Sequence, residues 1–242
     1  MDNAVASARR GMSDLSIRNL FIIPTIAFLI LINIFPLFYS LILSFADFSA
    51  ISGDPPDWIG IRNYRELLRD PHVWESLYLT MKYVLISVSG QLVVGFSIAL
   101  LLNRKIPAKG LITTLLLLPM MMSMAIVGLF WKLLYGPSWG IINYLLGLGK
   151  FVWLSNADMA LLAIAITDIW MWSPFVMLLS LAGLSAIPQH LYEAAAIDRA
   201  SRWFTFSRIT LPLVIPLLLI AVIFRTLEAF KTFDLADRKS VV

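Results

Sequence analysis

The sequence predicts an all-α membrane protein, a polytopic bundle of transmembrane helices, on two observations. Hydrophobic residues make up 60% of the 242 positions and charged residues only 14%, whereas soluble domains carry about 25% charged residues. The apolar residues are also concentrated in long runs of roughly 20 or more, and a helix of that length crosses about 30 Å of hydrocarbon.

Five of these runs are predicted to span the membrane. They cover residues 20–45, 77–102, 111–135, 159–184 and 211–230. The first run is much longer than the roughly 7–15 apolar residues of a signal peptide, and no small-residue cleavage site follows it. We therefore expect it to be a membrane helix.

The charges between the spans predict the orientation, because Lys and Arg favour cytoplasmic loops. If the chain alternates, the three basic segments fall on one side: the tail 1–19, the loop 103–110 and the segment 185–211. The acidic segment 46–76 and the segment 136–158 fall on the other side. We therefore expect a multi-pass protein with a cytoplasmic N-terminus.

The C-terminal end does not fit this topology. A fifth crossing leaves residues 231–242 outside, yet they include Lys231, Arg238 and Lys239. Either the atypical tail 236–242 is an exception, or the natural chain continues through a sixth helix into the cytoplasm; we expect the second.

Residues that catalysis and metal binding commonly use are scarce. The chain has no Cys and only two His, His72 and His190, so a His/Cys metal site is not expected. Gly149-Lys150 lacks the upstream Gly and the following Ser or Thr of a phosphate-binding loop. We expect no catalytic residue, no metal and no cofactor on this chain. The net charge of +4 reflects orientation rather than nucleic-acid binding.

A charged insert, "EAAAIDRASRWFTFSRITLP" (193–212), lies between the fourth and fifth spans. Pro188 suits the first turn of a helix, and residues 189–200 are free of Gly and Pro and rich in Ala, so a short helix is predicted. A second short helix is predicted over 201–209, before the fifth span. Residue types alone fit a helix on lipid headgroups as well as a docking surface.

The spacing within the insert resembles the EAA signature of permease subunits of bacterial ATP-binding-cassette importers. That signature reads E-A-A, three residues, Gly, nine residues, I-x-L-P. Here Glu193, Ala194 and Ala195 are followed at the same spacing by Arg199, in place of the Gly, and by "ITLP" (209–212).

The resemblance covers nearly the whole chain. The stretches similar to the carbohydrate-uptake branch are "FPLFYSLILSFADF" (35–48), "IGIRNYRELLRDPHVWESLYLT" (59–80), "LSAIPQHLYEAA" (184–195) and "FKTFD" (230–234). They are most similar to the maltose-type or glycerol-phosphate-type first permease subunit. The resemblance implies a permease domain over 20–235, with six core helices in the family, in a bacterial inner membrane.

The same resemblance implies partners and a function. The implied partners are a second permease subunit in a heterodimer, a cytoplasmic ATPase dimer that holds ATP and Mg, an extracytoplasmic solute-binding protein and the lipid bilayer. The implied function is ATP-driven uptake of a sugar or sugar-like solute, with no enzyme activity on this chain. Other classes are an ion-coupled secondary carrier, which would show inverted repeats and broken mid-membrane helices, and a membrane scaffold.

Residue by residue, the resemblance implies a coupling loop over 185–211. Glu193, Ala194 and Ala195 would enter a cleft of the ATPase, and Asp198 would shape the bend after them. Arg199 stands where a Gly would permit a tight bend with positive φ, which a Cβ disfavours.

Asp168 and Trp172 are candidates for the solute path. They lie four residues apart in the fourth span, so they share a helix face. A carboxylate beside an indole suits sugars, whose hydroxyls donate to oxygen and whose C–H faces stack on aromatic rings. The alternative is that Asp168 bonds to a neighbouring helix while Trp172 is packing.

Arg225 and Glu228 are further candidates in the fifth span. Together with Lys231 and Asp234 they alternate in charge every three residues, a spacing at which helical neighbours interact. They form either a self-neutralising ridge near the outer end or a face toward the solute path or the partner permease.

Overall fold

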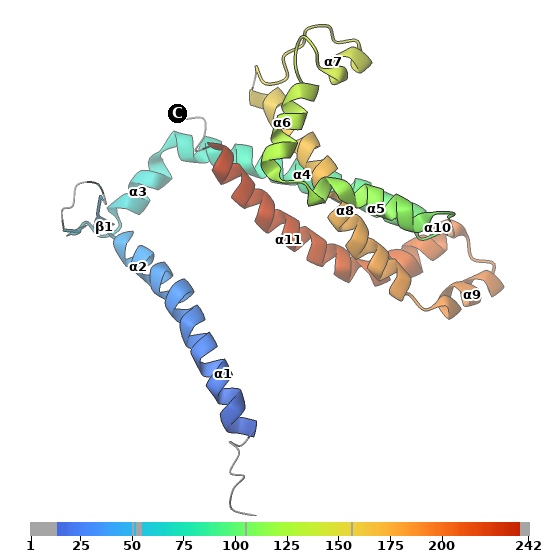
Figure 1. The fold of residues 1–242 in the computed structure, drawn as a ribbon, viewed down its shortest axis with the longest axis horizontal. Helices are drawn as coiled ribbons and strands as arrows, with labels where there is room; N and C mark the ends of the chain where they lie inside the picture. The colour runs from blue at the N-terminus through green and yellow to red at the C-terminus, as the bar shows by residue number, and fades with distance from the viewer. Residues whose placement is uncertain (1–13, 50, 52–54, 105, 156, 238–242) are drawn as a thin grey trace, which may run out of the picture. The chain divides into compact units, whose positions relative to one another are not determined.

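The computed structural model describes residues 14–49, 51, 55–104, 106–155 and 157–237 of the chain. Figure 1 shows that the described part is built of helices, with one short antiparallel pairing between β1 (Ala46–Asp47) and β2 (Asp57–Trp58). The predicted all-α fold is confirmed. The chain divides into two compact units, Met1–Glu75 and Ser76–Val242.

The first unit begins with one long helix made of α1 (Asp14–Leu29), a π turn (Ile30–Ile34) and α2 (Phe35–Leu43). The π turn precedes Pro36 in the first turn of α2, where a proline has no N–H to donate. Residues 14–19 of the predicted tail are therefore helical, and the rest of that tail lies outside the described residues. The hairpin strands and α3 (Arg62–Arg69) follow.

The second unit contains the remaining membrane helices. Its long helices are α4 (Pro71–Leu102, which begins in the first unit), α8 (Ala157–Ala186) and α11 (Leu211–Asp237). Together with the first helix they give, within the described residues, four helices long and apolar enough to cross a membrane, or five if the bent pair α5 (Lys109–Met121) and α6 (Met124–Leu134) counts as one span.

The prediction of a continuous third span over 111–135 is wrong. α5 and α6 meet at an angle of 96°, and Figure 1 shows α6 turning away from α5. Met122 is extended, and Ser123 starts a new helix by accepting a hydrogen bond from the N–H of Ile126. Pro119 lies in the last turn of α5, which lacks one backbone donor there.

The prediction that a separate short helix over 201–209 ends before the fifth span is also wrong. α10 (Arg202–Thr205) runs through a second π turn (Phe206–Thr210) directly into α11, and Arg202–Lys231 forms one candidate span. α11 continues to Asp237, so the start of the tail 236–242 is helical, and residues 238–242 lie outside the described residues. The predicted short helix of the insert is present as α9 (Gln189–Ile197).

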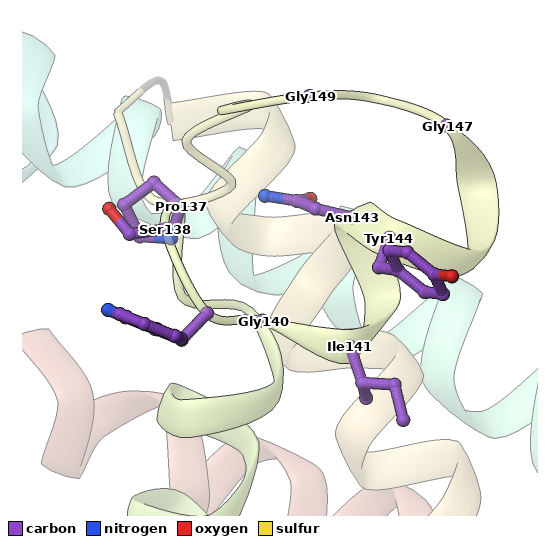
Figure 2. Close-up of a pocket in the computed structure, with 9 residues that line it drawn as sticks. Pro137, Ser138, Gly140, Ile141, Asn143, Tyr144, Gly147 and Gly149 are labelled. Carbon is purple, nitrogen blue, oxygen red and sulfur yellow. The ribbon is translucent and has the colours of Figure 1, made fainter.

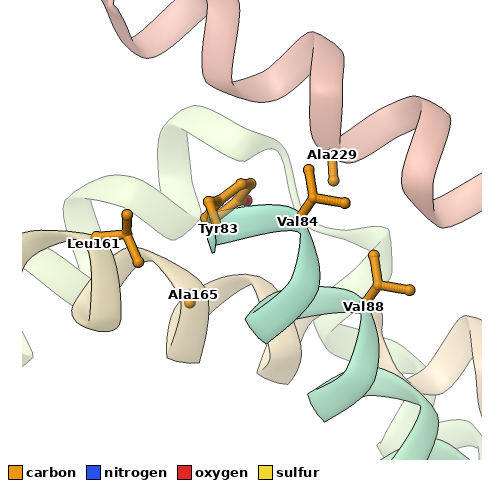
Figure 3. Packing of buried hydrophobic residues seen from close by; sticks show 6 residues of the cluster. All are labelled: Tyr83, Val84, Val88, Leu161, Ala165 and Ala229. Atoms are coloured by element: carbon orange, nitrogen blue, oxygen red, sulfur yellow. The ribbon is translucent and has the colours of Figure 1, made fainter. Parts of the chain in front are cut away.

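The core of the second unit is a layer between α4, α8 and α11. Figure 3 shows Val84 of α4 near Ala229 of α11, and Tyr83 near the α8 residues Leu161 and Ala165; Val88 completes the buried cluster. Small side chains at two of these positions allow the helices to approach closely, as is common in membrane bundles.

Two glycines of α4 make the contact with α8 especially close. A Cβ at Gly95 would lie 2.6 Å from the backbone oxygen of Ser173 and 2.7 Å from Cβ of Val176. A Cβ at Gly90 would lie 2.3 Å from Cδ1 of Ile169, the flexible end of a side chain. Gly95 therefore faces rigid backbone, whereas the neighbour of Gly90 can move.

This difference predicts unequal effects of alanine. Gly95→Ala should lower the free energy of unfolding by about 1–3 kcal/mol, because overpacking against backbone forces a shift of α4 from α8. Gly90→Ala should cost less, and Gly128→Ala, which meets nothing within 4 Å, serves as the control. Thermal unfolding in detergent measures all three; equal midpoints for Gly95→Ala and Gly128→Ala would contradict the close contact.

Candidate functional site

The connection from α8 to α11 forms a compact hook of well-defined geometry. Asp198 caps the C-terminal end of α9, and Arg199 follows with φ +52°, in the left-handed region. The N–H of Arg199 donates to the carbonyl of Ala196 (3.1 Å) and the N–H of Ala200 to that of Ala195 (2.9 Å). This pair of bonds is the Schellman ending of a helix. The bend with positive φ that the resemblance implied is present.

The predicted coupling residues are only partly exposed. Glu193, Ala194, Asp198 and Arg199 are exposed, whereas Ala195 is buried. Ala195 therefore lies on the side of α9 that packs against the rest of the chain.

The hook also exposes three apolar side chains, of which we did not single out the two aromatic ones from the sequence. Trp203 is 74% exposed and Phe204 52% exposed, and Ile197 at the end of α9 is 82% exposed. The aromatic pair Trp203-Phe204, directly after Arg202, was the available signal. One hydrogen bond holds the hook to the membrane helix: the hydroxyls of Tyr192 and Thr210 lie 3.1 Å apart.

A second site is a buried polar cluster within the membrane helices. Asp168 of α8, Arg225 of α11 and Gln91 of α4 are all buried and bonded to one another. Nη2 of Arg225 lies 3.3 Å from each carboxylate oxygen of Asp168. The Gln91 amide donates to Asp168 Oδ2 (2.7 Å) and accepts from Nε of Arg225 (2.8 Å).

The sequence places this cluster one helical turn from the apolar layer of Figure 3. Gln91 follows Val88 by three residues, and Asp168 follows Ala165 by three. Arg225 precedes Ala229 by four residues, so all three polar side chains continue the faces already buried in the bundle.

Trp172 completes the cluster. The guanidinium carbon of Arg225 lies 4.4 Å from the centre of the Trp172 ring, a cation–π geometry. The indole Nε1 of Trp172 is buried and has no hydrogen-bond partner among the described residues. It is thus a buried donor without an acceptor, next to the cluster.

The four predicted path residues do not all come together. Asp168, Trp172 and Arg225 meet, but Glu228 is exposed and accepts from Nζ of Lys231 at 2.8 Å. Part of the predicted charged ridge therefore exists, while Arg225 turns inward from it; the side chain of Asp234 lies outside the described residues. The bond from Asp168 to neighbouring helices matches the alternative noted from the sequence. Gln91 was missed.

The segment 136–155, which follows α6, folds into a small knob. It contains a pocket of ≈ 580 Å³, which Figure 2 shows around α7 (Ile141–Leu146). Asn143 organises the knob: its amide donates to the carbonyl of Phe151 (2.7 Å) and accepts from the indole of Trp153 (2.7 Å). Trp139 at its rim is 96% exposed. The pocket contains none of the predicted site residues.

The second unit is thus a bundle of candidate membrane helices with an ordered hook between two of them. Residues 91–237 match the family described as binding-protein-dependent transport system inner membrane component. The chain belongs to this family.

Relatives cover almost the whole chain. The trehalose/maltose transport system permease protein of Thermococcus litoralis is 36% identical over 97% of this chain and 80% of its own length. The sulfoquinovosyl glycerol transport system permease protein of Agrobacterium fabrum is 35% identical over 93% of this chain and 74% of its own length.

The fold is similar to that of a solved structure. A chain of a bacterial ABC transporter involved in the import of the acidic polysaccharide alginate superposes with a TM-score of 0.73. The sequence identity is 23%, and the match covers 86% of this chain and 71% of that chain.

The left-handed conformation of Arg199 predicts a stability gain on substitution. Arg199→Gly should raise the free energy of unfolding by about 1 kcal/mol, because a Cβ disfavours this conformation. Arg199→Ala removes the same charge but keeps the Cβ, so it should bring no such gain. Thermal unfolding of both variants in detergent measures this; equal midpoints would show that the backbone at 199 is unstrained.

Proposed function

We propose that this chain is a permease subunit of an ATP-driven importer and carries a sugar or sugar-like solute across a bacterial inner membrane. Its family supplies inner membrane components of binding-protein-dependent transport systems. Relatives over 30% identical are named for trehalose, maltose and sulfoquinovosyl glycerol transport. The observation that carries the proposal is the ordered hook with its exposed acidic and apolar residues between two spans.

In this proposal the hook lies in the cytoplasm and docks on an ATPase subunit, with the N-terminus on the same side. Three arginines in the insert support that side. Glu193 and Ala194, which are exposed, provide the contact, while the buried Ala195 supports the helix from beneath. ATP and Mg are held by the ATPase dimer, and a second permease subunit completes the membrane path.

Transport then follows from linkage between nucleotide and solute. ATP favours one arrangement of the ATPase dimer, which moves α9 and, through the short connections on either side, α8 and α11. An extracytoplasmic binding protein delivers the solute, which the two arrangements bind with different affinities. Only that difference in affinity can couple solute binding to the change between the two arrangements.

Trp172 and the cluster beside it form this chain's part of the solute path in the proposal. The unpartnered indole N–H can donate to a hydroxyl, and the ring offers a face for stacking. Because Asp168 and Arg225 are bonded to each other, they form part of the wall of the path and are not free charges that bind the solute.

The break between α5 and α6 favours a second candidate, an ion-coupled carrier, because broken membrane helices are typical of that class. Ion coupling also needs ligands or titratable groups at the break. Residues 110–131, which include the break, contain no charged residue. We therefore prefer the ATP-driven importer.

Charge reversal on the hook tests the proposal. Glu193→Lys should reduce ATP-driven solute uptake by reconstituted complexes about tenfold or more, because like charges at an interface cost several kcal/mol. ATP hydrolysis and uptake are measured together in proteoliposomes that contain all subunits.

Glu75→Lys is the matched control, since it makes the same charge reversal at an exposed position outside the hook. It should leave the ratio of uptake to hydrolysis unchanged. Normal coupling in Glu193→Lys would argue against docking through this surface.

A further inference from the structure

The three polar residues of the buried cluster do not contribute equally. The contacts between Arg225 and Asp168 are 3.3 Å long, beyond the roughly 2.7–2.9 Å of a well-formed charge-assisted bond. The two short bonds, 2.7 Å and 2.8 Å, are both made by Gln91. The neutral amide therefore makes the shortest bonds to both charged groups and joins them across three helices.

Gln91 can do this because a side-chain amide has both donors and an acceptor. Its Nε2 donates to Asp168 and its Oε1 accepts from Arg225. Among side chains of this length, Glu cannot donate when ionised, and Met or Leu can do neither. Gly90 and Gly95 hold α4 close enough to α8 for the amide to reach.

We propose that Gln91 is a positioning residue that clamps α4 to α8 and α11, so that the three helices move as one body when the hook moves. The proposal rests on the proposed function for its mechanical role. α8 leads into α9 after two residues, and α11 follows the hook as one continuous helix, so both receive its displacement directly. α4 lacks such a connection: the Lys82–Asp158 ion pair ties it to α8, the apolar layers pack it against both helices, and the Gln91 amide bonds to both α8 and α11.

A second consequence concerns Trp172. The Gln91 bond to Nε directs the Arg225 guanidinium, and that group covers the Trp172 ring. Loss of Gln91 therefore changes the surroundings of the Trp172 ring as well as the helix register. Solute uptake, which depends on the proposed path beside this ring, is then a readout of the proposal.

An exchange of the acid and the amide tests the clamp. Gln91→Glu alone places two carboxylates against one guanidinium, and Asp168→Asn alone leaves Arg225 without its counter-charge. The double variant restores one acid and one base, with Glu at 91 accepting from Arg225 and from the new amide at 168.

The measured quantities are solute uptake per ATP hydrolysed in proteoliposomes, and the fraction of folded complex by size-exclusion chromatography. Each single variant should lose about tenfold or more in uptake per ATP or in folded complex, because Gln91→Glu adds an uncompensated buried carboxylate and Asp168→Asn leaves a buried guanidinium unpaired. The double variant should recover several-fold over either single variant, because it again pairs one carboxylate and one amide with the buried guanidinium.

Ser89→Ala is the control, because its hydroxyl bonds only to carbonyls of its own helix. Recovery in the double variant supports the clamp even where the single variants fail to fold. A double variant as poor as either single one, or single variants with normal coupling, overturns it. If the wild-type complex itself shows no ATP-driven uptake, the proposed function fails, while recovery of folding in the double variant still supports the clamp.

Discussion

The pairing of Asp168 with Arg225 inside the membrane helices is the constraint on which the packing of the second unit depends. On insertion scales a charged side chain near the bilayer centre costs about 2.5–3.5 kcal/mol, so each charge needs the other. Both are buried, and each reaches a different helix. The apolar layer beside them contains small residues such as Ala165 and Ala229, which would pack in more than one register. A slide of one turn keeps such a layer apolar but separates the charges, so the polar cluster selects the register.

The same register fixes how the hook is attached to the bundle. α8 ends two residues before α9, and α10 continues into α11 without a break in the helix. Short, hydrogen-bonded joints transmit displacement better than flexible loops, because each backbone bond they keep resists a change in φ or ψ. The Tyr192–Thr210 contact adds a lateral tie between α9 and the start of the long helix. A force on the exposed side of α9 therefore acts on two membrane helices at once.

The sequence was sufficient for the features that depend on composition and spacing. The apolar runs predicted the spans, and the alanine-rich stretch before Asp198 predicted α9. The sequence was insufficient where the structure depends on the direction in which a helix runs or on which helices come together. Hydropathy measures how apolar the run 111–135 is. It does not show whether Pro119 and Ser123 divide the run into two helices, because the packing of both halves decides that. Gln91 belongs to no motif and has no charge, and its importance arises only because α8 and α11 bring Asp168 and Arg225 beside it.

Arg199 shows how a departure from a family signature can change stability without changing shape. The glycine of the signature suits a left-handed residue, yet Arg199 adopts that conformation with φ +52°. The two closing bonds of the motif use backbone atoms only, so they form with any residue that accepts the strain. The strain, roughly 1 kcal/mol, is small beside the several bonds and buried contacts that fix both ends of the hook. The hook therefore keeps its compact ending, and the arginine adds an exposed positive charge directly after Asp198.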